Sequence, residues 1–127
     1  FRRIALVPDG GSTYMLTRAI GRARAMEMML MGEKVFAPQA LEWGLINRVT
    51  TPETLLDEAK TLAHELAAGP TQTLSMIRKM VWAGLDNHWE DQLALERRIQ
   101  SEAGQTSDFK IGVMAFLTKQ VAKFTGS

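Results

Sequence analysis

Apolar residues recur at helical spacing along most of the chain, and glycine or proline interrupts each run. Residues three or four positions apart share one face of a helix, so such runs predict amphipathic helices. One apolar stripe joins Leu55, Leu56, Ala59, Leu62, Ala63 and Leu66. A second stripe, which we expect to be the buried face of the next helix, joins Leu74, Ile77, Val81 and Leu85.

The first part of the chain turns sharply before its first helix. Proline presets its own φ and glycine allows left-handed backbone, so the Pro-Asp-Gly-Gly sequence at 8–11 predicts a turn. Ser12 or Thr13 is expected to cap a helix that stops at Gly21. A second helix over 22–31 is apolar around most of its circumference, which indicates contact with a part not present here.

Capping residues also place the later helices. Pro52 is expected to open one, with Glu53 beside its positive end. A long helix is predicted over 89–103, and Ser107 is expected to cap the last one. The tail at 119–127 mixes apolar and basic residues, and we expect it to be irregular.

Two short segments have the composition of strands. Residues 1–7 could end a strand, and 45–49 alternates weakly between apolar and polar residues. Because a strand must pair its backbone groups, a strand here would need partners from sequence outside this chain. The expected fold class is therefore mainly α, a helical region with one or two short strands from the edge of an α/β core.

Composition excludes several kinds of function. Hydrophobic residues make up 46%, charged residues 23% and the net charge is +1, so neither a nucleic-acid surface nor a polybasic membrane anchor is expected. No apolar run is long enough to span a bilayer. With no cysteine, and with His64 and His88 far apart, no metal site is expected. The absence of cysteine fits a reducing compartment, and we expect a cytoplasmic protein.

Asp9 is the first candidate for chemistry. An aspartate in such a turn is usually a turn or capping residue, but a carboxylate near a helix start can also take a proton from carbon. The helix dipole favours its charged form, whereas a buried pocket would favour its protonated form. Gly10 and Gly11 do not have the spacing of a nucleotide-binding loop, so nucleotide hydrolysis and NAD binding are discounted.

Basic and aromatic residues near the end of the chain form a second candidate site. Lys119 and Lys123 flank a short apolar segment that ends at Phe124. The simpler interpretation is a frayed basic tail. The functional one is a lysine that reaches a ligand phosphate, with an aromatic ring nearby for an adenine.

Read together, these segments resemble the crotonase superfamily of enoyl-CoA hydratases and isomerases, in its C-terminal half. The family pattern has an apolar residue, a proline, a glycine or aspartate and a glycine-rich stretch, and Val7, Pro8, Asp9, Gly10 and Gly11 match it. No single segment is specific, but their order and spacing are. The matching segments are 7–13, 16–18, 20–21, 24–25, 30–32, 37–45, 112–119 and 124–126.

The resemblance implies an architecture and partners. Residues 1–50 would be the end of a spiral α/β core, and 51–127 a helical region for oligomerisation and coenzyme A contact. The intact protein would form a homotrimer or hexamer and act on acyl-CoA substrates of fatty acid or aromatic degradation. Coenzyme A would be part of the substrate, so no separate cofactor is expected.

The resemblance also implies a reaction. Family hydratases carry a catalytic glutamate eight positions before the residue that matches Asp9, and that position here is Phe1. Members with an aspartate matching Asp9 include isomerases in which it transfers a proton, and overall similarity is greatest to the ring-epoxide isomerases of phenylacetyl-CoA breakdown. The leading hypothesis is therefore an acyl-CoA thioester isomerase acting through an enolate, with Asp9 as the catalytic residue.

The remaining assignments concern substrate binding. Besides Pro8 and Gly10, the resemblance assigns contacts with coenzyme A to Phe116, Lys119 and Phe124. The family's oxyanion-hole donors come from upstream segments, so the chain alone is expected to lack normal turnover. Two alternatives stay open: an enoyl-CoA hydratase, which is a lyase, and a helical association module without catalysis.

Overall fold

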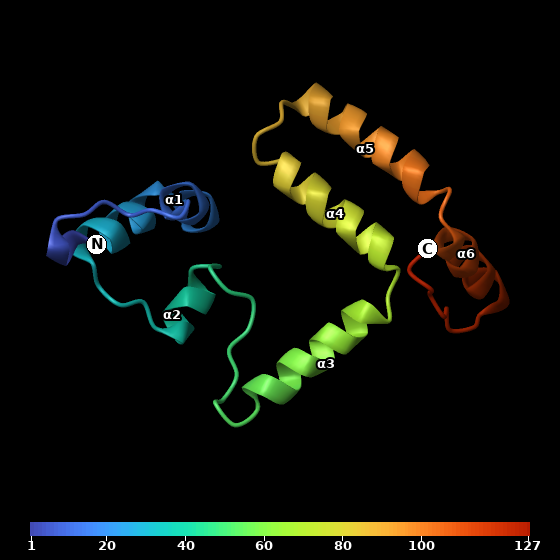
Figure 1. Cartoon of the computed structure of the whole chain (residues 1–127), viewed down its shortest axis with the longest axis horizontal. Coiled ribbons are helices and arrows are strands. Elements are labelled where there is room, and N and C mark those ends of the chain that lie inside the picture. Colours follow the sequence, from blue (N-terminus) through green and yellow to red (C-terminus); the bar gives the residue numbers. More distant parts are fainter. The chain divides into compact units, whose positions relative to one another are not determined.

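Six α-helices and one turn of 3-10 helix make up the computed structural model, which describes residues 1–127 (Figure 1). In chain order the elements are η1 (Arg2–Ile4), α1 (Ser12–Met31), α2 (Ala37–Glu42), α3 (Leu55–Ala67), α4 (Thr71–Ala83), α5 (Trp89–Ala103) and α6 (Ser107–Thr118). The predicted, mainly α fold class is confirmed, and the helix predicted over 89–103 is α5. No helix is both long and apolar enough to cross a membrane.

Neither predicted strand is present. Residues 1–7 contain the single turn η1, in which the carbonyl of Phe1 accepts bonds from the N–H groups of Ile4 and Leu6 at 3.0 and 3.2 Å. Residues 45–49 are irregular. The prediction of strands was wrong for this chain because an extended segment is stable only when its backbone groups are paired, and no second strand exists here to pair them.

The chain divides into two compact units, Phe1–Pro52 and Glu53–Ser127. The roles expected for the two parts stay a prediction: residues 1–50 as the end of a spiral α/β core, and 51–127 as a region for oligomerisation and coenzyme A contact.

In the first unit, α1 is interrupted at Gly21, as predicted. Gly21 has φ 79° and ψ 159°, a conformation that only glycine adopts readily. The guanidinium of Arg2 donates to the carbonyl of Met31 at 2.7 Å, which ties η1 to the end of α1. Arg24 lies 5.4 Å from the ring centre of Trp43, a cation–π contact that links α1 with the residue after α2.

Three predicted helix starts were wrong. Gly11, not Ser12 or Thr13, is the N-cap of α1, and the hydroxyl of Ser12 instead donates to the carbonyl of Asp9 at 2.7 Å.

Helix α3 begins three residues after Pro52, at Leu55. The capping residue of α6 is Thr106, whose Oγ1 accepts the N–H of Phe109 at 3.1 Å, one position before the predicted serine. The error at α6 arose because Thr106 and Ser107 are neighbours of similar capping propensity.

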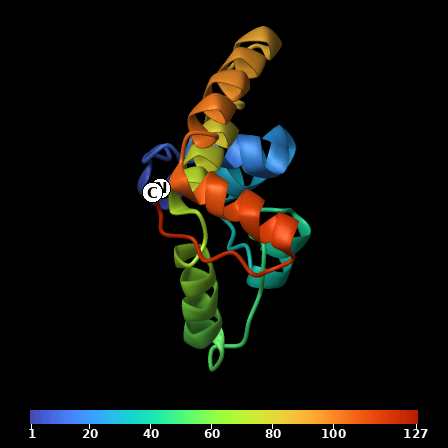
Figure 2. The same cartoon turned by 90° about the vertical axis from the view of Figure 1, so that its right-hand side faces the viewer.

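In the second unit, α4 and α5 lie side by side as an antiparallel hairpin (Figure 1). The side chain of Gln92 on α5 donates to the carbonyl of Met80 on α4 at 3.2 Å. After α6 the chain forms no helix or strand, as predicted for the tail, and residues 119–127 run back alongside α6 (Figure 2). The tail is therefore irregular in conformation but packed against a helix.

Most apolar side chains stay exposed. The accessible surface is 10297 Å², whereas two separate compact bodies of these sizes would expose roughly 8,000 Å². The prediction that this helix buries its apolar face was wrong within this chain: Ile77 and Val81 on α4 are 46% and 65% exposed, and Leu85, which lies after the end of α4, is 45% exposed. The buried hydrophobic side chains are Ile20, Ala25, Ala40 and Ile99.

Replacing Gly21 with alanine should destabilise the first unit. A Cβ at Gly21 would meet no atom within 4 Å, so the penalty comes from the backbone conformation alone and should be about 1–3 kcal/mol. Gly84→Ala is the matched control, because Gly84 has φ −63° and its added Cβ would lie 3.4 Å or more from its neighbours. Urea denaturation followed by circular dichroism measures the free energy of unfolding of both variants. An equal loss of stability in Gly21→Ala and Gly84→Ala would contradict the backbone explanation.

Candidate functional site

The turn before α1 holds the predicted catalytic residue. Gly10 and Gly11 have φ of 61° and 79°, which explains why two glycines follow Asp9. The carbonyl of Asp9 accepts two bonds from Ser12, from its N–H at 3.1 Å and from its hydroxyl at 2.7 Å. The backbone of Asp9 is thus fixed at the start of α1, while its carboxylate is exposed and accessible to a reacting proton.

A hollow of about 190 Å³ lies beside this turn, and we call it the turn hollow. Pro8 and Phe1 both line it, together with the apolar side chains of Leu16 and Met28. The structure thus brings the position of the expected hydratase glutamate next to the Asp9 turn, and the side chain there is a phenyl ring. Glu33 also lines the turn hollow and was not singled out from the sequence, because nothing local distinguishes it from a solvated acid at a helix end.

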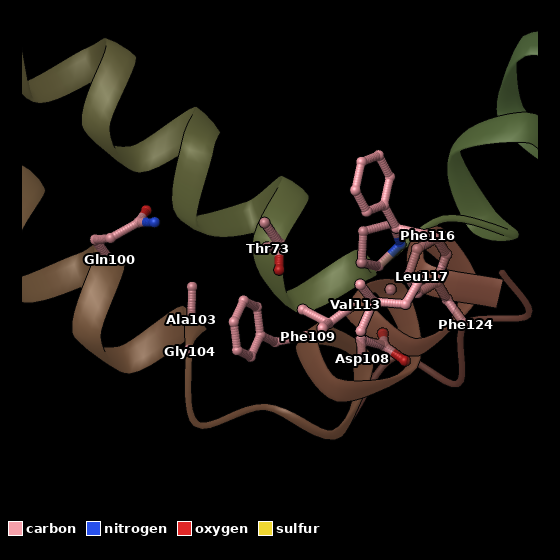
Figure 3. A pocket seen from close by; sticks show the side chains of 12 residues that line it. Thr73, Gln100, Ala103, Gly104, Asp108, Phe109, Val113, Phe116, Leu117 and Phe124 are labelled. Atoms are coloured by element: carbon pink, nitrogen blue, oxygen red, sulfur yellow. The ribbon is translucent and has the colours of Figure 1, made fainter. Parts of the chain in front are cut away.

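A larger hollow of about 530 Å³, the α6 hollow, lies in the second unit. Phe116 and Phe124, both predicted to contact substrate, line it, and Phe109 adds a third aromatic ring. In Figure 3, Phe109 extends toward the end of α5 and Phe116 lies on the opposite side of the hollow. Phe116 is 83% exposed, so its ring face is available to a ligand. The structure therefore brings two of the predicted binding residues together.

Lys119 lines neither of these hollows. It is the C-cap of α6, in the left-handed conformation with φ 54°, and its N–H donates to the carbonyl of Phe116 at 3.2 Å. Lys123 and Lys110 line a separate hollow of about 630 Å³ on another face of α6. Lys119 is thus close to Phe116 along the backbone, without being part of the same wall.

The candidate residues fall into both units. Pro8, Asp9 and Gly10 belong to Phe1–Pro52, whereas Phe116, Lys119 and Phe124 belong to Glu53–Ser127. No group of three or more histidine, cysteine, aspartate or glutamate side chains is placed to hold a metal ion.

Asp108 is a buried carboxylate that sequence reasoning missed. It lies in the first turn of α6, is 2% exposed, and accepts hydrogen bonds from Thr125 and Gly126 of the tail. The backbone N–H of Thr125 holds the pKa of Asp108 below its ordinary value of 3.8, and the Gly126 N–H and Thr125 hydroxyl add to this, while burial acts the other way. An acidic residue in the first turn of a helix is usually exposed to solvent and stabilised by the helix dipole. The sequence around Asp108 therefore gave no sign that this carboxylate is buried.

Comparison with known proteins gives a consistent result. A family model described as enoyl-CoA hydratase/isomerase matches residues 1–127. The 1,2-epoxyphenylacetyl-CoA isomerase of Escherichia coli K12 is 44% identical over 126 residues, which are 99% of this chain and 48% of that protein. The trans-2-decenoyl-(acyl-carrier-protein) isomerase of Streptococcus mutans is 36% identical over 126 residues, again 99% of this chain and 48% of that protein.

Solved structures agree with the sequence relatives. The crystal structure of an enoyl-CoA hydratase subunit I from Geobacillus kaustophilus superposes with a TM-score of 0.96 and 32% identity, covering 99% of this chain and 49% of that one. The chain therefore spans about half the length of the relatives it matches. The resemblance found in its motifs is confirmed.

Acid should weaken the attachment of the tail. A carboxyl whose pKa is lower in the folded chain stabilises it above the unfolded pKa, and this contribution is lost as the pH falls through the folded pKa. The melting temperature of Asp108→Asn should thus lie below that of the unsubstituted chain at neutral pH, and the gap should narrow from about pH 5 downward.

Thermal melts followed by circular dichroism measure this gap. Asp91→Asn is the control, since it removes an exposed carboxylate from the first turn of α5 and should change the melting temperature little. A gap for Asp108→Asn that is the same at every pH would contradict a contribution from the charged form.

Proposed function

Because this chain belongs to the enoyl-CoA hydratase/isomerase family, we propose that it provides the proton-transfer residue of an acyl-CoA thioester isomerase. The observation that carries the proposal is the surroundings of the turn: Pro8 and Phe1 line the turn hollow, and Asp9 follows Pro8 directly without lining it. An aspartate stands on the turn at the start of α1, and Phe1 occupies the position where family hydratases have a glutamate. The 44% identity to an isomerase of Escherichia coli supports the same choice.

Hydration and isomerisation place different demands on this site. Adding water to a double bond requires a group that activates the water, and the two-glutamate mechanism of the family uses a carboxylate for this. The phenyl ring of Phe1 can neither accept nor donate a proton. Moving a double bond requires only that one group take a proton from carbon and return one to another carbon, which a single carboxylate can do.

Asp9 would take the proton from carbon in the acyl chain, and the electron pair would pass to the thioester oxygen as an enolate. The carboxyl of Asp9 would exchange its proton with solvent, and returning a proton at a different carbon would complete the isomerisation. The negative charge on oxygen requires hydrogen-bond donors at that atom, usually a large share of the rate enhancement. In the family those donors come from segments upstream of the part matched by this chain, so we propose that the chain alone is inactive.

Binding of the coenzyme A portion is proposed for the remaining predicted residues. The exposed ring of Phe116, with Phe124 in the same α6 hollow, offers aromatic surface for an adenine ring. Lys119 offers an ammonium group for a phosphate. Pro8, which lines the turn hollow, and Gly10, which does not, belong to the turn against which the acyl part would lie. We further propose a cytoplasmic homotrimer or hexamer, in which the exposed apolar helices are covered.

Two other functions are distinguished by their products. Structural similarity to an enoyl-CoA hydratase favours hydration as the second candidate, and hydration would add water to the substrate, whereas isomerisation leaves its mass unchanged. The extensive exposed apolar surface favours a helical association module, which would change no substrate.

Asp9→Asn should abolish most turnover while retaining binding of the CoA ester. A full-length enzyme for this test joins the chain to the part of the Escherichia coli relative that it does not cover. The amide has nearly the shape of the carboxylate but cannot accept the proton, so turnover should fall about 10²–10⁴-fold with little change in affinity. Glu27→Gln, at an exposed position on α1, is the control. Unchanged turnover by Asp9→Asn would refute the assignment.

The chain by itself should turn over enoyl-CoA esters at the background rate. The fused enzyme should restore turnover, because the fusion supplies the donors to the enolate oxygen. Liquid chromatography with mass detection measures turnover by the chain alone and by the fused enzyme, over a panel of enoyl-, dienoyl- and aryl-CoA esters. Turnover by the chain alone that equals turnover by the fusion would contradict the need for upstream donors.

A further inference from the structure

The side chain of Asp108 accepts three hydrogen bonds, and all of them come from the tail. Its Oδ1 accepts the backbone N–H of Thr125 at 2.7 Å and the hydroxyl of Thr125 at 3.1 Å. Its Oδ2 accepts the backbone N–H of Gly126 at 2.9 Å, and its own N–H donates to the carbonyl of Ser127 at 2.9 Å. One buried residue thus holds three consecutive residues of the tail.

A second contact fixes the same part of the tail from another side. Gly126 has φ +76°, and a Cβ there would lie 2.7 Å from Oγ1 of Thr71, the first residue of α4. The positive φ favours glycine at 126, and an added Cβ would also require the hydroxyl of Thr71 to move. The end of the tail is held between the first turn of α6 and the first turn of α4.

This attachment determines where Phe124 lies. Phe124 directly precedes Thr125, and its ring approaches Gly112, where an added Cβ would be 3.5 Å from Cε1 of the ring. The ring forms part of the wall of the α6 hollow, which Asp108 also lines (Figure 3). The remainder of the tail belongs to no helix or strand that could position it instead.

We propose that Asp108 is a positioning residue for ligand binding: it holds the tail so that Phe124 forms a wall of the α6 hollow. The consequence for ligands rests on the proposed function, which assigns this hollow to the planar ring of coenzyme A. Asp108 touches no ligand in this proposal and acts through Thr125, Gly126 and the ring of Phe124.

The carboxylate is the chemical group that this position requires. Two N–H groups and one hydroxyl converge on its two oxygens, and charge-assisted bonds of this kind are stronger than neutral ones. Asparagine has the same shape but only one acceptor oxygen, so its NH₂ group would face an N–H donor. Asp108→Asn should therefore detach the tail with little loss of side-chain volume.

The test compares Asp108→Asn with Asp91→Asn in the 127-residue chain. Both remove a carboxylate from the first turn of a helix, but Asp91 is exposed. Amide hydrogen exchange should accelerate at least tenfold at Thr125 and Gly126 in Asp108→Asn and stay unchanged in Asp91→Asn. The dissociation constant of free coenzyme A, from titration calorimetry, should rise about tenfold in Asp108→Asn alone, as expected for loss of one aromatic contact.

A double substitution separates positioning from general loosening of the fold. If Asp108 acts through Phe124, Asp108→Asn should weaken coenzyme A binding no further once Phe124→Ala is present. Thr125→Val is the milder variant, since it removes one hydroxyl and keeps both backbone donors, and its effects should be intermediate.

Two results would overturn the proposal: tail amides in Asp108→Asn that exchange as slowly as in the unsubstituted chain, or effects of Asp108→Asn and Phe124→Ala that simply add. Absence of coenzyme A binding by the unsubstituted chain would contradict the proposed function instead. Amide exchange at Thr125 and Gly126 would in that case still decide whether Asp108 holds the tail.

Discussion

Helices are held together by burial of apolar surface, and the helices of this chain bury little apolar surface against one another. The accessible surface exceeds that of two separate compact bodies by roughly 2,000 Å², the area that a specific protein interface buries. Stable proteins cover surface of this extent with another part of the molecule or with a second chain. That requirement agrees with a chain that spans about half the length of its relatives.

Because few apolar side chains are buried, individual hydrogen bonds hold several parts of the chain in place. The turn at Asp9 is closed by Ser12, the end of α1 by Arg2, and the tail by Asp108. These contacts suffice to place a carboxylate at a helix start and an aromatic wall beside α6. They do not supply the donors that an enolate oxygen needs, which is why the proposed chemistry requires more than this chain.

The limits of sequence reasoning follow from the same physics. Helical periodicity and glycine breaks predicted α5 and the interruption at Gly21, because these depend on residues near in sequence. Burial of α4 and a strand at 45–49 were predicted from local patterns, but both need packing or pairing partners that the other elements of this chain do not provide. Asp108 was missed for a related reason: its partners lie seventeen and eighteen residues away, and only the folded tail brings them together.

Solvent deuterium separates proton transfer from water addition most directly. The enzyme assembled with the upstream part of its Escherichia coli relative would be incubated with an enoyl-CoA ester in D₂O and the products analysed by mass spectrometry. We expect an isomer that carries deuterium and no added oxygen, and no such product from Asp9→Asn. A product that has gained water, formed equally well by Asp9→Asn, would contradict it.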